Sequence, residues 1–276
     1  MKKFVKNCIG NVVKKASLWA SNRGCLKRDD FLELFPNDVI YTNYGRIKFY
    51  SPSEILFWRS RSFFEKEPET IDWINSFDKN AVFWDIGANV GLYSLYAAKK
   101  GLNVCAFEPV SQNIHIINKN ILINKLDHKI AMYPIAFAGA TKLSEMFIQN
   151  LAIGDAENTF DKPVDWQNKN YEVKFKQAAI GYTIDDFLNV FGLSFPDYIK
   201  IDVDGLEYEI LYGASETLGS NKLKQILVEL YLEDPRYSEL ISYINSKGFV
   251  LDSKKRSKLF DNTVYQNVYN HIFVRN

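Results

Sequence analysis

The stretch AVFWDIGANVGLYSLYAAKKGLNVCAFEP, residues 81–109, decides the fold of this chain. Its first residues, 81–84, form a short apolar run that is typical of a strand covered on both faces. Asp85 ends that run, and Gly87 and Gly91 bracket a turn where the backbone can bend sharply and approach a ligand closely. The sequence therefore predicts a strand that leads into a glycine-containing turn.

A helix and a second strand complete this unit. After Gly91, apolar residues at helical spacing predict a helix that Gly101 ends. Residues 104–107 then form a second apolar strand, which Glu108 caps. Two parallel strands joined by a helix place Asp85, the turn and Glu108 in one crevice, because open α/β sheets bind ligands at the carboxyl ends of their strands.

The spacing of the acid and the glycines indicates the ligand. Glu108 lies about 20 residues beyond the first glycine and suits the ribose hydroxyls of a nucleoside-like cofactor. A dinucleotide fingerprint needs glycine at Asn89 and at Leu92, and the Asn89 side chain stands where a pyrophosphate needs bare backbone. S-adenosylmethionine has a ribose and no phosphate, and the turn and Asp85 can meet its amino-acid end directly or through water. The methyl donor is therefore favoured over a dinucleotide, with an unliganded turn as a further alternative.

Four stretches together resemble the FkbM family of S-adenosylmethionine-dependent methyltransferases. They are KEPETIDWI (66–74), FWDIGANVGLYSLYAA (83–98), FEPVSQNIHIINKNILIN (107–124) and YIKIDVDGLEYEILYGA (198–214). DIGANVG followed by FEP looks like motif I and the ribose acid of class I enzymes. The resemblance covers about residue 50 to the end and implies an α/β fold: a doubly wound, mostly parallel seven-stranded sheet with helices on both faces. Its implied strand order is 3-2-1-4-5-7-6, with strand seven antiparallel.

The resemblance also implies the cofactor-binding residues. They are Asp85, Gly87, Ala88, Asn89, Gly91, Glu108, Pro109, Ala136, Phe137 and Asp202. Ala136 and Phe137 end a predicted third strand, 130–137, and should lie beside the adenine. Many class I enzymes have a polar residue nearby, whereas this chain has Ala138 and Gly139, so adenine contacts are expected from the backbone.

The chain divides into an extension and one Rossmann-like domain. We assign residues 1–52 to a basic N-terminal segment and a short β arm, and residues 53–276 to the methyltransferase domain. Within the domain, residues 53–78 form N-terminal helices, which close over the cofactor in the resemblance. Residues 139–182 form an insert that is either a lid for the acceptor or an elaborated surface hairpin. In this insert, we predict that 146–149 and 171–175 form an antiparallel pair.

A second polar stretch lies where a later strand enters a turn. Lys200, Asp202 and Asp204 share one face of the strand, and polar groups at the end of a buried strand need compensation or a function. The next strand stays apolar until Glu229. In the expected strand order, the ends at Glu108, Asp202 and Glu229 converge on the crevice that holds Asp85.

Methyl transfer requires alignment of donor and acceptor, and a sugar hydroxyl must also lose its proton. Asp202 is our first choice for orienting the donor or acceptor, and Glu229 is our choice of base. Asp204 and Glu207 can take the same roles or hold a divalent cation through their oxygens, but no metal site is predicted. His271 in the last strand is more simply explained by packing.

Composition limits the remaining function classes. The chain has 276 residues, 47% of them hydrophobic, which suffices for one full core plus an extension. With 34 basic and 33 acidic residues, the net charge of +1 argues against a nucleic-acid partner. The three cysteines lack CxxC spacing, and no apolar run reaches about 18 residues. These features predict a cytoplasmic protein with no membrane span.

The N-terminal segment departs from this neutral balance. Residues 1–30 hold eight Lys/Arg against Asp29 and Asp30, with apolar residues among them. Such a segment can make peripheral contact with an anionic membrane surface, and a solvated helix or frayed tail is the simpler alternative.

We therefore predict an FkbM-like, S-adenosylmethionine-dependent O-methyltransferase. The acceptor class, a hydroxyl of a sugar or of a polysaccharide or glycolipid precursor, comes from the resemblance alone. A small-molecule natural product is the alternative acceptor, and a non-catalytic binding protein is the alternative class. The DxD pair Asp202 and Asp204 also permits a glycosyltransferase, but the DIGANVG turn lacks the phosphate-binding features that such an enzyme needs.

Overall fold

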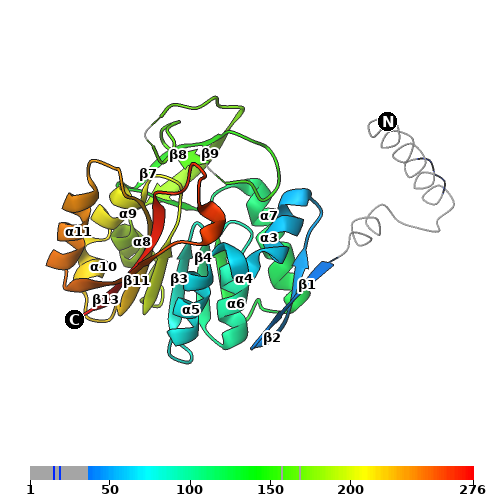
Figure 1. The fold of residues 1–276 in the computed structure, drawn as a ribbon, viewed down its shortest axis with the longest axis horizontal. Coiled ribbons are helices and arrows are strands. Elements are labelled where there is room, and N and C mark those ends of the chain that lie inside the picture. Colours follow the sequence, from blue (N-terminus) through cyan, green and yellow to red (C-terminus); the bar gives the residue numbers. More distant parts are fainter. Residues whose placement is uncertain (1–14, 16–18, 20–36, 157, 168) are drawn as a thin grey trace.

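The computed structural model describes Lys15, Trp19 and residues 37–156, 158–167 and 169–276 (Figure 1). Apart from Lys15 and Trp19, the predicted basic segment 1–30 lies outside the described residues. No helix among the described residues is both long and apolar enough to cross a membrane.

A seven-stranded sheet forms the centre of the domain, in the order β12-β13-β11-β10-β3-β4-β5. Its strands are β3 (Val82–Ile86), β4 (Asn103–Phe107), β5 (Ile130–Tyr133), β10 (Tyr198–Ile201), β11 (Gln225–Tyr231), β12 (Phe249–Lys255) and β13 (Val268–Arg275). Strands β5, β4, β3, β10 and β11 run parallel, whereas β13 is antiparallel to β11 and to β12. Counted along the chain, this order is 3-2-1-4-5-7-6, so the predicted fold class and strand order are confirmed.

Helices cover both faces of this sheet (Figure 1). One face carries α5 (Pro68–Ser76), α6 (Leu92–Lys100) and α7 (Ser111–Asn124), and the other carries α8 (Ile184–Phe191), α9 (Glu207–Tyr212), α10 (Ser215–Gly219) and α11 (Tyr237–Ser246). Successive strand residues point to opposite faces, so Phe83 is buried in the first core cluster and Trp84 in the second. This double burial explains why the central strands read as continuous apolar runs.

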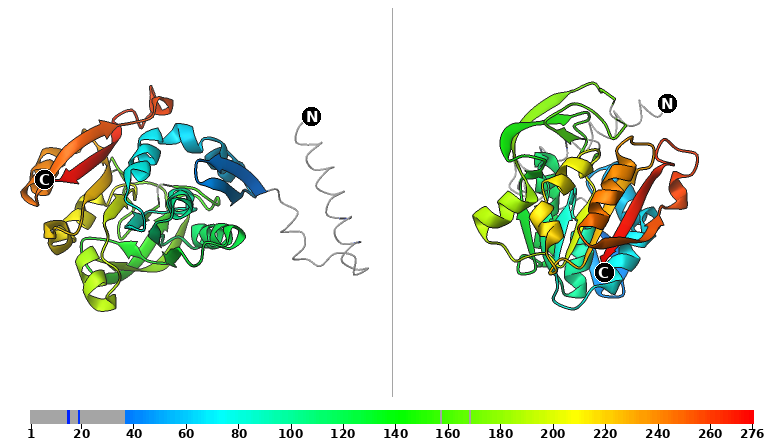
Figure 2. Two further views of the ribbon diagram at one scale, coloured as in Figure 1. Left: turned by 90° about the horizontal axis from the view of Figure 1, so that it is seen from below. Right: turned by 90° about the vertical axis from the view of Figure 1, so that its left-hand side faces the viewer.

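The N-terminal part of the domain packs beside α6 and α7. The hairpin β1 (Asn37–Thr42) and β2 (Gly45–Tyr50) lies at the opposite end of the molecule from β12 and β13 (Figure 2). Its Tyr50 N–H donates to Asn120 of α7 at 2.8 Å. Ser53 then caps α3 (Glu54–Arg61), since its hydroxyl accepts the Leu56 N–H at 3.3 Å. After Ser62 the short helix α4 (Phe63–Lys66) follows, so helices occupy the predicted range 53–78.

The insert forms a second sheet of four strands, in the order β6-β9-β7-β8. These are β6 (Ala136–Phe137), β7 (Lys142–Ile148), β8 (Thr159–Phe160) and β9 (Phe175–Tyr182). The predicted third strand was therefore too long: β5 ends at Tyr133, and Pro134, which has no N–H for a ladder, precedes the change of sheet. The antiparallel partner of β7 is also later than predicted, because Ile148 pairs with Phe175 and the pairing continues to Gly181.

Candidate active site

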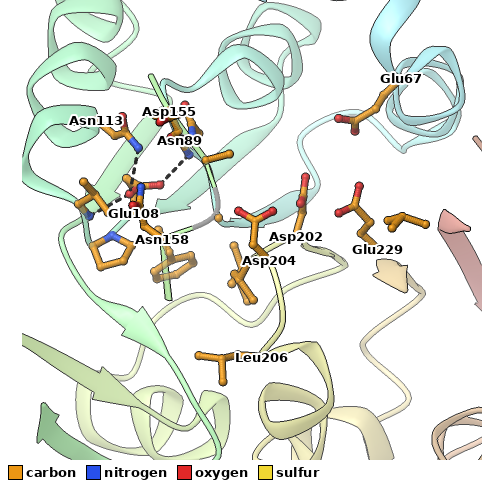
Figure 3. A pocket seen from close by; sticks show the side chains of 18 of the residues that line it. Glu67, Asn89, Glu108, Asn113, Asp155, Asn158, Asp202, Asp204, Leu206 and Glu229 are labelled. Atoms are coloured by element: carbon orange, nitrogen blue, oxygen red, sulfur yellow. Dashed lines mark hydrogen bonds between the residues drawn. The ribbon is translucent and has the colours of Figure 1, made fainter. Parts of the chain in front are cut away.

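A cavity of about 270 Å³ lies at the carboxyl ends of the central strands. The predicted cofactor residues on its wall are Gly87, Asn89, Glu108, Pro109, Ala136, Phe137 and Asp202, and the predicted catalytic residues Asp204 and Glu229 line it as well. Figure 3 shows Glu108 and Asn89 at one end of this cavity, and Asp202, Asp204 and Glu229 at the other. The structure thus brings together polar residues that are widely separated in the sequence.

Asp85, Ala88 and Gly91 are not among the residues that line the cavity. Strand β3 continues to Ile86, so Asp85 lies within the strand rather than after it, and only 1% of it is exposed. Its Oδ2 accepts the Ser94 hydroxyl at 2.5 Å, and burial raises the pKa of this carboxyl. The sequence placed Asp85 after the end of the strand, whereas the structure buries it within β3, outside the lining of the cavity.

The glycines of the turn are required by the packing of the protein itself. Gly87 has φ +82°, and a Cβ there would lie 1.8 Å from the carbonyl oxygen of Asp202. Gly91 also has φ +82°, and a Cβ there would lie 2.6 Å from Ile117 of α7. The turn after β3 thus approaches the end of β10 so closely that only glycine fits at position 87.

The carboxylate of Glu108 is held at one end of the cavity. Its Oε2 accepts the Asn89 N–H at 2.9 Å, and its Oε1 accepts the Val110 N–H at 2.9 Å and the Asn113 amide at 3.4 Å (Figure 3). Burial raises the pKa of Glu108 to about 7, although these donors favour the ionised form.

Hydrogen bonds hold residues 154–155 of the insert at the Glu108 end of the cavity. The Asn89 side chain donates to the Asp155 carbonyl at 2.9 Å, and the Gly154 N–H donates to Asn113 at 3.1 Å. Arg59 of α3 donates to the Gly154 carbonyl at 2.7 Å. Arg59 and Asn113 could not be identified from the sequence, because both bind backbone atoms of a distant segment.

The other end of the cavity is rich in carboxylates. One oxygen each from Asp202, Asp204 and Glu229 lie within 4.8 Å of one another, a spacing compatible with a metal ion. Burial, together with the negative charges of Asp202 and Glu67, raises the pKa of Glu229 well above its usual range.

Glu67 belongs to this end, although sequence reasoning assigned it no role. It follows α4 in the chain, is buried, and points toward Asp202 and Glu229 (Figure 3). Burial alone would raise its pKa, but the charges of Lys66 and Lys200 lower it to about 2. Lys66 lies 3.0 Å from the Glu67 carboxylate, so Glu67 is an ionised group on the cavity wall.

Two other residues considered from the sequence, Glu207 and His271, make hydrogen bonds within the protein itself. Glu207 accepts the Val203 N–H at 2.9 Å and the Gly205 N–H at 3.0 Å, so it braces the turn after β10. His271 is fully buried, accepts the Tyr237 hydroxyl at 2.8 Å and donates to the Tyr269 carbonyl at 2.9 Å. Burial lowers the pKa of His271 to about 4, and this residue does not line the cavity.

Comparison with known proteins identifies the family. The model of the methyltransferase FkbM domain matches residues 85–251, which contain the glycine turn, Glu108, Asp202 and Glu229. The chain belongs to the FkbM methyltransferase family. This FkbM-family chain is therefore an S-adenosylmethionine-dependent methyltransferase.

Individual relatives are distant. Methyltransferase sdnD of Sordaria araneosa is 23% identical over 201 residues, which cover 64% of this FkbM-family chain and 76% of that protein. The crystal structure of methyltransferase FkbM from Methylobacillus flagellatus KT is 17% identical, with a TM-score of 0.47, over 72% of this chain. The match spans only 44% of the length of that Methylobacillus chain. TrmK of M. capricolum, solved with S-adenosylhomocysteine, is 11% identical with a TM-score of 0.45, over 75% of this chain and 67% of that one.

Proposed function

We propose that this methyltransferase transfers a methyl group from S-adenosylmethionine to a hydroxyl of a sugar or of a polysaccharide or glycolipid precursor. The observation that carries the proposal is the division of one cavity between a ribose-type acid, Glu108, and a cluster of carboxylates around Asp202. The first end suits the cofactor, and the second end suits an acceptor that donates hydrogen bonds.

The residues at the Glu108 end fit S-adenosylmethionine. Glu108 is fixed by N–H donors and lines the cavity, so an ionised carboxylate there can accept both ribose hydroxyls. Ile135, Ala136 and Phe137 supply an apolar wall for the adenine. Gly87 and Asp202 lie at the junction of the two ends and suit the amino-acid end. When bound, S-adenosylmethionine supplies an activated methyl group on a sulfonium.

The acceptor end suits a carbohydrate. The carboxylate oxygens of Glu67 and Asp204 can accept hydrogen bonds, and each sugar hydroxyl can donate one. Trp58, Phe260 and Tyr265 line the same cavity and offer flat apolar surface for the C–H faces of a sugar ring. The excess of carboxylates disfavours a phosphate next to the methylated hydroxyl, since like charges repel at close range.

Glu229 suits the role of general base. It lies on β11, and one of its carboxylate oxygens is within 4.8 Å of an oxygen of Asp202 and of Asp204, so it can accept a proton from a hydroxyl bound there. Glu67 then orients the acceptor hydroxyl, while Asp202 holds the amino-acid end of the methyl donor, so that positioning supplies most of the rate enhancement.

A transfer assay tests this function. The full chain is incubated with methyl-labelled S-adenosylmethionine and a panel of neutral glycans, sugar phosphates and non-carbohydrate alcohols, and label is measured in each product. We expect labelled methyl ethers on neutral glycans or glycolipids. Label found only on non-carbohydrate alcohols would reject the sugar acceptor, and label found only on nitrogen would reject O-methylation.

A further inference from the structure

Lys200 is a buried lysine in the middle of the sheet. It belongs to β10, whose four residues are all buried, and only 1% of Lys200 is exposed. On the neighbouring strand β3 its register partner is Asp85. Burying an ammonium group is costly unless it is paired and hydrogen-bonded, so the contacts of Lys200 require an explanation.

The ammonium of Lys200 reaches forward to the cavity wall. Its Nζ lies 2.5 Å from Oδ2 of Asp202 and 5.2 Å from the centre of the Tyr93 ring. The Tyr93 hydroxyl in turn bonds to Glu67. Burial alone would lower the pKa of Lys200, but the charges of Asp202, Glu67 and Asp85 raise it, so Lys200 stays protonated.

This contact fixes the Asp202 carboxylate in one orientation. With Oδ2 bound to Lys200, rotation of the carboxylate would break a charge-assisted hydrogen bond inside the protein. Asp202 still lines the cavity, and its side chain is 20% exposed. Its backbone carbonyl oxygen lies against Gly87, so the residue that carries this carboxylate adjoins the glycine turn.

We propose that Lys200 is a positioning residue that holds the Asp202 carboxylate toward the glycine turn, where it binds the ammonium group of the cofactor's amino-acid end. This inference rests on the proposed cofactor. It differs from a purely structural role, in which Lys200 only neutralises Asp85 inside the sheet. In the structural role, replacing Lys200 changes stability without changing ligand affinity through Asp202.

A double-mutant cycle separates the two roles. Isothermal titration with S-adenosylhomocysteine, which carries the same amino-acid end, is performed on the unaltered chain, K200M, D202N and K200M/D202N. We expect K200M and D202N each to weaken binding about tenfold or more, as expected for a lost hydrogen bond to a charged group. The double variant should bind no more weakly than D202N alone, because both changes remove the same contact.

A second comparison separates a loss of affinity from a loss of stability in K200M. K200M leaves Asp85 buried without its lysine, so D85N and K200M/D85N form a pair in which that carboxylate is neutral in both members. We expect K200M to weaken binding of S-adenosylhomocysteine by the same factor in the D85N protein as in the unaltered chain. Lys100 provides a matched control, since its ammonium donates to three backbone carbonyls of the α5 region away from the cavity. K100M should lower Tm and leave the affinity unchanged.

Each outcome distinguishes this inference from the proposed function. If the unaltered chain does not bind S-adenosylhomocysteine, the proposed cofactor is wrong and the role of Lys200 fails with it. If the unaltered chain binds but the losses in K200M and D202N are additive, the positioning role alone is rejected. The positioning role is also rejected if K200M binds as tightly as the unaltered chain and K200M/D85N binds as tightly as D85N.

Discussion

The Glu108 carboxylate accepts the backbone N–H of Asn89 at 2.9 Å, and the Asn89 side chain donates to the Asp155 carbonyl at the same distance. Asn89 adopts φ +50°, a left-handed conformation that asparagine tolerates better than most residues. A single residue of the turn therefore links the ribose-type acid to the insert. The side chain that argues against a dinucleotide also holds a segment of the insert beside the cavity.

Replacing Glu108 tests its role at the ribose end. Glu108→Gln keeps the size of the side chain but removes the negative charge and one acceptor oxygen. We expect the affinity for S-adenosylhomocysteine, measured by isothermal titration, to fall about tenfold or more. Glu145→Gln is the matched control, because Glu145 lies on β7 in an exposed ion pair with Lys176. Equal affinities for the two variants would contradict this assignment.

The pH dependence of stability follows from the same carboxyl. Burial raises the pKa of Glu108 from 4.5 to about 7. Because the folded pKa is the higher one, this group stabilises the fold fully below about pH 4.5, and the contribution is lost as the pH rises through about 7. We expect the Tm of the ligand-free protein to fall between about pH 4.5 and pH 7 because of this group, and to fall less in Glu108→Gln.

The affinity for S-adenosylhomocysteine should change in the opposite direction over this range, because ribose hydroxyls donate to the ionised carboxylate. Glu207, whose pKa burial raises to about 8, titrates in both proteins, so the test is the difference between the unaltered chain and Glu108→Gln. Parallel Tm curves for the two proteins would show that Glu108 does not titrate as described.

Gly87 provides a test of the close approach between the turn and β10. In Gly87→Ala the new Cβ would lie 1.8 Å from the Asp202 carbonyl oxygen at φ +82°. We expect a loss of at least about 2 kcal/mol in the free energy of unfolding, measured by urea denaturation. Gly219→Ala is the control, since nothing lies within 4 Å of a Cβ there. If Gly87→Ala is as stable as this control, the turn after β3 does not pack closely against the Asp202 carbonyl oxygen.

Glu229 should affect catalysis and not cofactor affinity. In Glu229→Gln we expect the affinity for S-adenosylhomocysteine to stay within about twofold, and methyl transfer to the active glycan to slow by about 10²–10⁴-fold, as for a lost general base. The exposed Glu233, four positions further along the chain, gives the control Glu233→Gln. Normal turnover in Glu229→Gln would remove it from the proton-transfer step.

Local patterns predicted the sheet well and the details of the site less well. The apolar runs at β3, β4 and β10, and the glycines that end α6 and α11, depend on nearby residues and could be read directly. Glu67 could not, because its role depends on Lys200, which only the folded sheet brings near it. Asp85 was predicted to end its strand, but β3 continues to Ile86 and Asp85 is buried within it. Ala136 and Phe137 line the cavity, but they belong to the sheet of the insert.

The measurement that tests the central claim most directly is a thermal-shift panel on the full chain with S-adenosylmethionine, S-adenosylhomocysteine, NADH, and a UDP-sugar with manganese. A ligand at about 100 times its Kd adds roughly 2.7 kcal/mol to stability, which corresponds to a Tm shift of several degrees for a domain of this size. We predict a shift with the two adenosyl compounds and none with the others. A shift with NADH or the UDP-sugar alone would contradict the assignment of Glu108 and the glycine turn to the methyl donor.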